Sequence, residues 1–356
     1  MRCTPLLHSV FAGTVMMVVG IATAPAVLEA MGTPEDILEP SIAYLRIYYL
    51  GMIGNLVYNI GAGILRAVGD SKRPLFFLIA SCITNILLNI LFVVGFDMGV
   101  AGSAWSTIIS QALSAVLVIL ALIRTKDMHR LTIRDIRLDR RMLMRIIRIG
   151  FPAGLQSIMY SSSNVIIQAS INSLGTDTVA AWTAYSKIDS LFWMIVSAFG
   201  ISITTFVGQN YGAGKAERMR KGVRICMAMT FAAAFLISFV LYFWGIYCYR
   251  LFTTDEAVIR IGVDMMRYLV PAYFTYVAIE ILAGALRGVG DCWIPMIICC
   301  IGICSLRMAW IMLAVPIHKD IYTIMFSYPL TWVVTTFLFI IYYLFFGKIK
   351  RKKTKV

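Results

Sequence analysis

The chain has 356 residues, of which 60% are hydrophobic and only 14% are charged. Soluble globular proteins carry about a quarter charged residues, so this composition excludes an ordinary soluble fold. The net charge of +14 comes from 32 basic and 18 acidic residues. Most of the basic residues gather in short segments between apolar runs, which is the orientation pattern of membrane proteins. Nucleic acid is therefore a poor candidate for a partner.

Ten apolar runs follow one another along the chain, each near the 20 residues that a helix needs to cross a bilayer. Lipid offers backbone groups no hydrogen-bond partner, so runs this long are predicted to be helices. We expect an all-α polytopic membrane protein. The predicted spans are 9–28, 41–65, 75–96, 100–123, 149–172, 178–207, 222–248, 260–286, 294–316 and 322–346.

One segment of the chain occurs twice in the same direction. Residues 63–74 (GILRAVGDSKRP) return 221 positions later as residues 284–295 (GALRGVGDCWIP). Internal repeats of this kind identify corresponding parts of a fold. Residues 1–135 are thus predicted to form one lobe with four helices, and 136–356 a second with a basic linker and six. The counterparts of the first two helices of the second lobe would precede Met1, so we expect the first lobe to lack two helices.

Each copy of the repeated segment is predicted to be a corner at the cytosolic surface, where one helix ends and the next begins. The glycine directly before the aspartate in each copy suits a helix C-cap with positive φ. The aspartate can cap the following helix, and the arginine can bond the last carbonyls and reach the headgroups. The predicted structural corner residues are Arg66, Gly69, Asp70, Arg287, Gly290 and Asp291.

The distribution of Lys and Arg predicts which side of the membrane each loop faces. It places both termini in the cytoplasm and indicates a multi-pass protein of the plasma membrane. The segment 124–148 carries nine basic residues between apolar ones. Such a segment suits an amphipathic connection lying on the cytosolic surface. Its apolar residues are Ile133, Ile136, Met142, Leu143, Ile146 and Ile147.

No arrangement of residues for covalent chemistry is visible in the sequence. The eight cysteines lie mostly within apolar runs and lack metal-site spacing, and none of the three histidines has partners typical of a catalytic triad. The chain is therefore predicted not to be an enzyme, to need no cofactor, and to have no certain metal site. No obligate protein partner is evident.

Three of the ionisable side chains inside the predicted spans stand out, and such residues are functional candidates because burying a charge in lipid is costly. Glu280 lies near the cytosolic end of one span, Asp189 near the middle of another, and Arg307 well inside a third. Either acid is a candidate to bind a coupling Na⁺ or H⁺, or a cationic substrate. The alternatives are that Glu280 reaches the nearby surface, that Asp189 forms a structural pair, and that Arg307 is a counter-ion.

Polar and aromatic residues of the spans supply further candidates for a substrate site. Gln156, Asn164 and Gln168 stand in an unusually polar span, and Asn59 is the repeat counterpart of Glu280. Polar residues also join helices in membranes, and aromatic residues also pack cores, so both readings stay open. The aromatic and methionine candidates for binding flat cations are Tyr160, Trp193, Met194, Tyr273 and Tyr276.

Several motifs together resemble the multidrug and toxic compound extrusion (MATE) family of cation-coupled exporters. They are the doubled Leu-Arg-x-Val-Gly-Asp corner, GVAGSA at 99–104, GFPAGLQ at 150–156, KID at 187–189 and FVGQNYGAG at 206–214. The resemblance covers essentially the whole chain. It implies a bundle of two six-helix lobes, in agreement with the parallel direction of the repeat.

The resemblance implies an antiporter that exports organic cations or drugs by alternating access, driven by Na⁺ or H⁺. With about ten helices instead of twelve, the chain is expected to act only as part of a longer protein. Two alternatives stay open: a flippase for lipid-linked sugars, which would need a strongly cationic cavity, and a non-transporting fragment. The first helix of the second lobe carries no Asp or Glu, which places the emphasis on Glu280 and Asp189.

Overall fold

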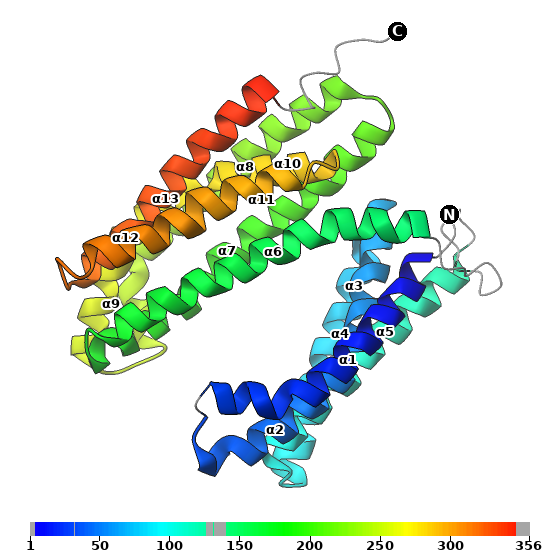
Figure 1. Cartoon of the computed structure of the whole chain (residues 1–356), viewed down its shortest axis with the longest axis horizontal. Helices are drawn as coiled ribbons and strands as arrows, with labels where there is room; N and C mark the ends of the chain where they lie inside the picture. The colour runs from blue at the N-terminus through cyan, green and yellow to red at the C-terminus, as the bar shows by residue number, and fades with distance from the viewer. Residues whose placement is uncertain (1–3, 32, 126–130, 132–139, 347–356) are drawn as a thin grey trace. The chain divides into compact units, whose positions relative to one another are not determined.

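The computed structural model describes residues 4–31, 33–125, 131 and 140–346, and the regular structure in these ranges is helical, without strands (Figure 1). The predicted all-α fold is confirmed. The helices form two compact units, residues 1–146 and 147–356. The division lies within one helix, a short distance after the predicted lobe boundary at 135.

Unit 1 is a bundle whose fully buried apolar residues lie on its third and fifth helices, at Leu65, Val118 and Leu122. In it α5 packs against α2, α3 and α4, and α1 packs against α2 and α3. Its elements are α1 (Thr4–Ala30), α2 (Glu35–Leu50), α3 (Met52–Ala67), α4 (Lys72–Asn89), the π-helical η1 (Ile90–Gly95) and α5 (Gly99–Arg124).

Unit 2 is built around α7 and α10, which pack against each other (Figure 1). α7 also contacts α8 and α9, and α10 also contacts α8 and α13. Its helices are α6 (Arg140–Asn172), α7 (Thr176–Gly212), α8 (Ala216–Arg250), α9 (Glu256–Leu269), α10 (Tyr273–Gly288), α11 (Trp293–Cys299), α12 (Leu306–Ala314) and α13 (Ile321–Ile341). Three short segments extend or join them: the 3₁₀ turn η3 (Val270–Ala272) and the π-helical η4 (Cys300–Ser305) and η5 (Tyr342–Phe346).

All ten predicted spans are helical, and eight helices of the described chain are long and apolar enough to cross a membrane. Two predicted spans are not among these eight helices, and the structure explains why. Gly51 divides the span predicted at 41–65 into two helices of 16 residues each. The span predicted at 149–172 lies in α6, whose many polar side chains lower its hydropathy. The crossing of the membrane by these two segments stays a prediction.

Both repeated corners have the predicted helix ending. Gly69 has φ +94° and Gly290 has φ +79°. The amide of each following aspartate donates to the carbonyl five residues earlier, Asp70 to Leu65 at 2.9 Å and Asp291 to Leu286 at 3.0 Å. This pattern is a Schellman motif, which requires a left-handed residue and therefore favours glycine.

The two corners differ in what their charged side chains do. Asp70 caps the next helix as predicted, because its Oδ1 accepts from the Arg73 amide at 3.1 Å. The prediction for Asp291 is wrong: its Oδ2 accepts from the Tyr342 hydroxyl at 2.7 Å, and the following helix has no side-chain cap bond. Arg287 was expected at helix carbonyls and instead pairs with Glu280. In the second copy, Asp291 thus bonds a distant residue, and Arg287 bonds an acid two turns earlier on its own helix.

Part of the predicted connection at 124–148 lies outside the described residues, including Ile133 and Ile136. Its last residues form the first turns of α6, which begins at Arg140 and continues into the predicted span. The predicted cytoplasmic chain ends also fall on residues 1–3 and 347–356, outside the described ranges. Amphipathic placement and orientation of the ends stay predictions.

Glycines bring α7 and α10 unusually close together. A Cβ on Gly284 would lie 2.8 Å from the carbonyl oxygen of Gly200, and one on Gly288 would lie 2.7 Å from that of Thr204. The Thr204 hydroxyl donates to the Gly284 carbonyl at 3.0 Å, across the two helices. Small residues allow such close backbone contact in membrane helices. The contact holds α10 in register with the face of α7 that carries Asp189.

Candidate functional site

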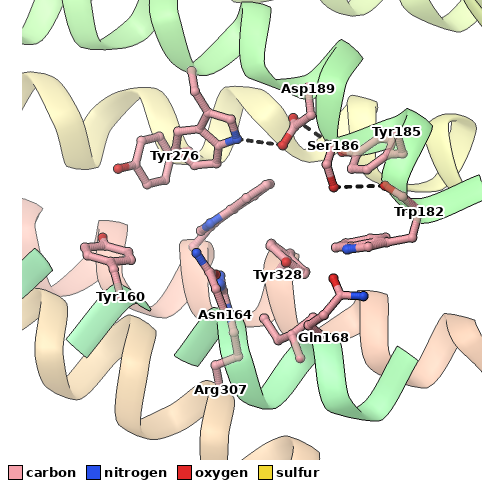
Figure 2. A pocket seen from close by; sticks show the side chains of 13 residues that line it. Tyr160, Asn164, Gln168, Trp182, Tyr185, Ser186, Asp189, Tyr276, Arg307 and Tyr328 are labelled. Carbon is pink, nitrogen blue, oxygen red and sulfur yellow. Dashed lines mark hydrogen bonds between the residues drawn. The ribbon is translucent and has the colours of Figure 1, made fainter. Parts of the chain in front are cut away.

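Unit 2 contains a cavity of about 490 Å³, and five helices supply its lining (Figure 2). This volume lies within the range of about 300–1,000 Å³ that is usual for small-molecule sites. The lining residues are Tyr160, Asn164, Ile167 and Gln168 of α6, Trp182, Tyr185, Ser186, Asp189 and Trp193 of α7, Tyr276 of α10, Arg307 of α12, and Tyr328 and Trp332 of α13.

Helical periodicity explains why residues so far apart in sequence line one cavity. The lining positions 182, 185, 186, 189 and 193 of α7 recur at the spacing of one helix face, and so do 160, 164, 167 and 168 of α6. α7 is apolar on the face that packs against the core, where Phe192, Val196 and Ile203 are buried. The polar and aromatic face is therefore left to the cavity.

Asp189 is a half-buried carboxylate on the wall of this cavity, held by neutral donors. Its Oδ2 accepts from the Trp193 indole at 2.6 Å, and its Oδ1 accepts from the Tyr273 hydroxyl. Oδ1 also accepts from the Tyr185 hydroxyl at 3.5 Å (Figure 2). Within the described residues it has no ion pair, and Lys187 is exposed. Neutral hydrogen-bond donors therefore hold the carboxylate in place.

Aromatic rings form a continuous wall around the carboxylate. Trp193 meets Tyr276 edge to face, with centroids 4.5 Å apart, and Trp332 lies 5.8 Å from Tyr276 and 5.6 Å from Tyr328. Trp182 continues the wall at 6.0 Å from Tyr328. Edge-to-face packing holds the rings in fixed orientations. The site therefore combines one negative charge with flat apolar surfaces.

Arg307 is the second charged residue of the cavity lining and is only 3% exposed. Its guanidinium lies 4.0 Å over the ring of Tyr328, and Nη2 donates to the Thr331 hydroxyl at 3.2 Å. The expected role as counter-ion is wrong for this structure, since no ion pair of the described chain joins Arg307 to Asp189 or Glu280. Figure 2 shows the side chain extending from α12 into the cavity.

Glu280 lies next to the cavity rather than in its lining. It forms an ion pair with Arg287, seven residues later on the same face of α10, at 2.9 Å. A Cβ on Gly200 would overlap the carboxylate, so Glu280 is packed directly on the α7 backbone. Tyr276 donates to Glu280 Oε2 at 3.4 Å and also lines the cavity. Tyr276 thus connects the ion pair to the cavity wall.

The remaining predicted residues are spread over the molecule. Asn164 and Gln168 line the cavity, and Gln168 donates to Asn172 at 2.8 Å. Gln156 and Met194 are not in the lining, and Met194 is exposed. Asn59 lies in unit 1, where its amide donates to Asn55. The described residues hold no group of three or more potential metal ligands, so Na⁺ at Glu280 or Asp189 stays a prediction.

Sequence reasoning missed several residues of the wall, although a signal was present. Trp182, Tyr185 and Ser186 share the face of Asp189, which a helical projection from that residue reveals. Tyr328 and Trp332 are four apart and lie on one face of α13. The pairing of Glu280 with Arg287 follows from their spacing of two helical turns. No sequence signal indicated that Tyr273 would bind Asp189 from another helix.

A polytopic helical bundle with an internal repeat and a charged, aromatic cavity defines a membrane transporter. The family model MatE matches residues 4–91 and 152–313. The chain therefore belongs to the multidrug and toxic compound extrusion family, as the sequence motifs predicted. It is a multi-pass membrane protein whose family consists of transporters.

Known proteins resemble the chain over most of its length. It is 26% identical to the probable multidrug resistance protein YoeA of Bacillus subtilis, covering 98% of this chain and 77% of YoeA. It is 27% identical to the probable multidrug resistance protein YpnP of the same organism, covering 76% of this chain and 60% of YpnP. A solved MOP superfamily transporter from Pyrococcus furiosus shares the fold, with a TM-score of 0.89 and 19% identity over 95% of this chain and 76% of that one.

Proposed function

We propose that the chain exports flat, amphipathic organic cations or drugs by alternating access, in exchange for Na⁺ or H⁺. The cavity of unit 2 is the proposed substrate site. The observation that carries the proposal is Asp189, a carboxylate in the wall of an aromatic cavity that forms no ion pair with any of the described residues. An intramembrane carboxylate is costly and is retained for function. The names of YoeA and YpnP, probable multidrug resistance proteins, support the substrate class.

In this proposal each part of the cavity has its own role. Asp189 supplies the charge that pairs with the substrate amine. Trp193, Tyr276 and Trp332 supply faces for cation–π contact and stacking, which accept many flat molecules because they demand no particular hydrogen-bond pattern. Asn164 adds an adaptable polar group. Broad selectivity follows from this composition.

We assign the coupling step to Glu280 and its ion pair. Protonation of Glu280, or Na⁺ binding there, weakens its bond to Arg287 and changes the hydrogen bond that Tyr276 donates. Tyr276 contacts Trp193, which in turn donates to Asp189. The coupling ion and the substrate amine thereby act on one connected set of side chains. Exchange requires that each ligand favour a different state of this set.

An efflux assay with matched variants tests the proposal. The chain is expressed in cells without their own exporters, and ethidium efflux is followed by fluorescence. We expect Asp189→Asn and Glu280→Gln to lose most of the efflux at equal membrane abundance. The exposed Asp264 of α9 provides the control, and Asp264→Asn should retain the efflux. Undiminished efflux in both test variants would overturn the site assignment.

The coupling ion is identified in proteoliposomes that carry either a Na⁺ gradient or a pH gradient. One of the two gradients should drive ethidium accumulation, and Glu280→Gln should abolish that response. Accumulation that depends on neither gradient would exclude the exchange mechanism.

A flippase for lipid-linked sugars is the second candidate, and buried Arg307 is the observation that favours it. That function calls for a strongly cationic cavity, whereas the described lining carries one acid, Asp189, and one base, Arg307. Drug export is therefore better supported. The further alternative, a fragment that does not transport, predicts no efflux from any version of the chain.

A further inference from the structure

We infer that Arg307 binds an anionic group of the substrate, so that the cavity selects zwitterions: flat aromatic molecules that carry a carboxylate as well as an amine. The inference rests on the proposed function and narrows its substrate class. In it Asp189 receives the amine, the aromatic wall receives the ring system, and Arg307 receives the carboxylate.

The bonding of Arg307 leaves part of its donor capacity unused. The side chain is 97% buried, yet its Nε has no hydrogen-bond partner among the described residues. The guanidinium makes one hydrogen bond there, to Thr331, and stacks on the ring of Tyr328. A guanidinium offers five donors in a planar fork that matches a carboxylate. Buried polar groups are nearly always satisfied, so an unpaired Nε at a cavity wall points to a ligand.

Charge balance gives the same conclusion. A buried cation without an acid is expensive, because neither water nor a counter-ion compensates its charge. Asp189 and Arg307 line the same cavity but do not pair, so each is available to an opposite charge. A zwitterion neutralises both charges at once. A simple cation neutralises only Asp189 and leaves Arg307 uncompensated.

The internal repeat shows that the architecture does not require an arginine at this position. The counterpart of Arg307 in unit 1 is Ile86, an exposed apolar residue. The stacking partner Tyr328 corresponds to Thr107. Arg307 also follows the π-helical η4, whereas in unit 1 the corresponding residues 79–84 are α-helical and the π-helical η1 comes later, at Ile90–Gly95. The arginine and its stacking partner thus belong to unit 2, whose cavity they line.

Two dyes that differ by one methyl ester provide the test. Rhodamine 110 carries a free carboxylate, and rhodamine 123 is its methyl ester and a simple cation. Binding is measured by fluorescence polarisation on the purified full chain in lipid nanodiscs, without any need for transport. We expect Arg307→Gln to raise the Kd for rhodamine 110 at least tenfold, which is about 1.4 kcal/mol. The Kd for rhodamine 123 should change less than threefold. Arg307→Lys keeps the positive charge but loses the planar set of donors. Its affinity for rhodamine 110 should lie between those of the wild type and Arg307→Gln.

The outcomes separate this inference from the proposed function. If Arg307→Gln and Arg307→Lys weaken the binding of both dyes equally, Arg307 has a structural role and the inference is overturned. Wild-type protein that binds rhodamine 123 but not rhodamine 110 would overturn it as well, while leaving cation export intact. Wild-type protein that binds neither dye would overturn both proposals.

Discussion

The ion pair between Glu280 and Arg287 should contribute measurably to stability, unlike most ion pairs on protein surfaces. The two side chains are 19% and 29% exposed, and Nη2 lies 2.9 Å from Oε1. At an effective dielectric constant of about 20, the attraction at this distance is about 6 kcal/mol. Desolvation of both groups offsets most of it. We expect a net coupling of about 2 kcal/mol, in the range of hydrogen bonds to charged groups.

A double-mutant cycle measures this coupling. Glu280→Gln, Arg287→Met and the double variant are unfolded, with the wild type, in mixed micelles of increasing SDS fraction, and Trp fluorescence reports the transition. The pair between Arg250 and Glu256 serves as the control, since its atoms are 3.4 Å apart and its side chains are 52% and 73% exposed. Exposed pairs typically contribute about 0.2–1 kcal/mol. A coupling at Glu280 no larger than at Glu256 would refute the reasoning.

Four further substitutions test glycines and a helix cap. Gly284→Ala should destabilise by about 1–3 kcal/mol in SDS unfolding, because its Cβ would meet the α7 backbone. Gly63→Ala, at the corresponding repeat position, has no atom within 4 Å of its Cβ and should stabilise by up to about 1 kcal/mol. Gly290→Ala should cost about 1–2 kcal/mol, because its φ is +79°. Asp320→Ala should cost about 1 kcal/mol by thermal unfolding, because Asp320 caps α13 through the Thr323 amide at 2.7 Å.

The cap also predicts a pH dependence. The Thr323 amide lowers the pKa of Asp320 from its ordinary value of 3.8. A carboxyl whose folded pKa is depressed stabilises fully above the unfolded pKa, and this stabilisation is lost as the pH falls through the folded value. Asp320→Asn keeps a capping oxygen and should remove this acid-side loss. A stability–pH profile of Asp320→Asn equal to that of the wild type would contradict the assignment of the cap. Equal changes in stability for Gly284→Ala and Gly63→Ala would contradict the close contact between α7 and α10.

Much of the site could be predicted because charge is rare in this chain. Asp189, Glu280 and Arg307 stand out in apolar runs, and two of them line the cavity. The partners on other helices could not be predicted in the same way. Tyr273 reaches Asp189 from another helix, and that contact depends on which helix faces meet. Arg287 lies seven residues from Glu280 on the same helix, so helical spacing could have indicated this pair.

The sequence alone determined that the chain is a series of helices with a parallel repeat and glycine-capped corners. The physical reasons are local: lipid forces backbone groups to bond within their own segment, and a left-handed corner residue favours glycine. The tertiary structure decided that Asp189 and Arg307 share one cavity and that Glu280 lies beside it. Hydropathy predicts that a helix lies in lipid, but it does not predict how the helix is rotated about its axis relative to a neighbouring helix. In unit 2 that rotation follows from the close contact of Gly284 with α7.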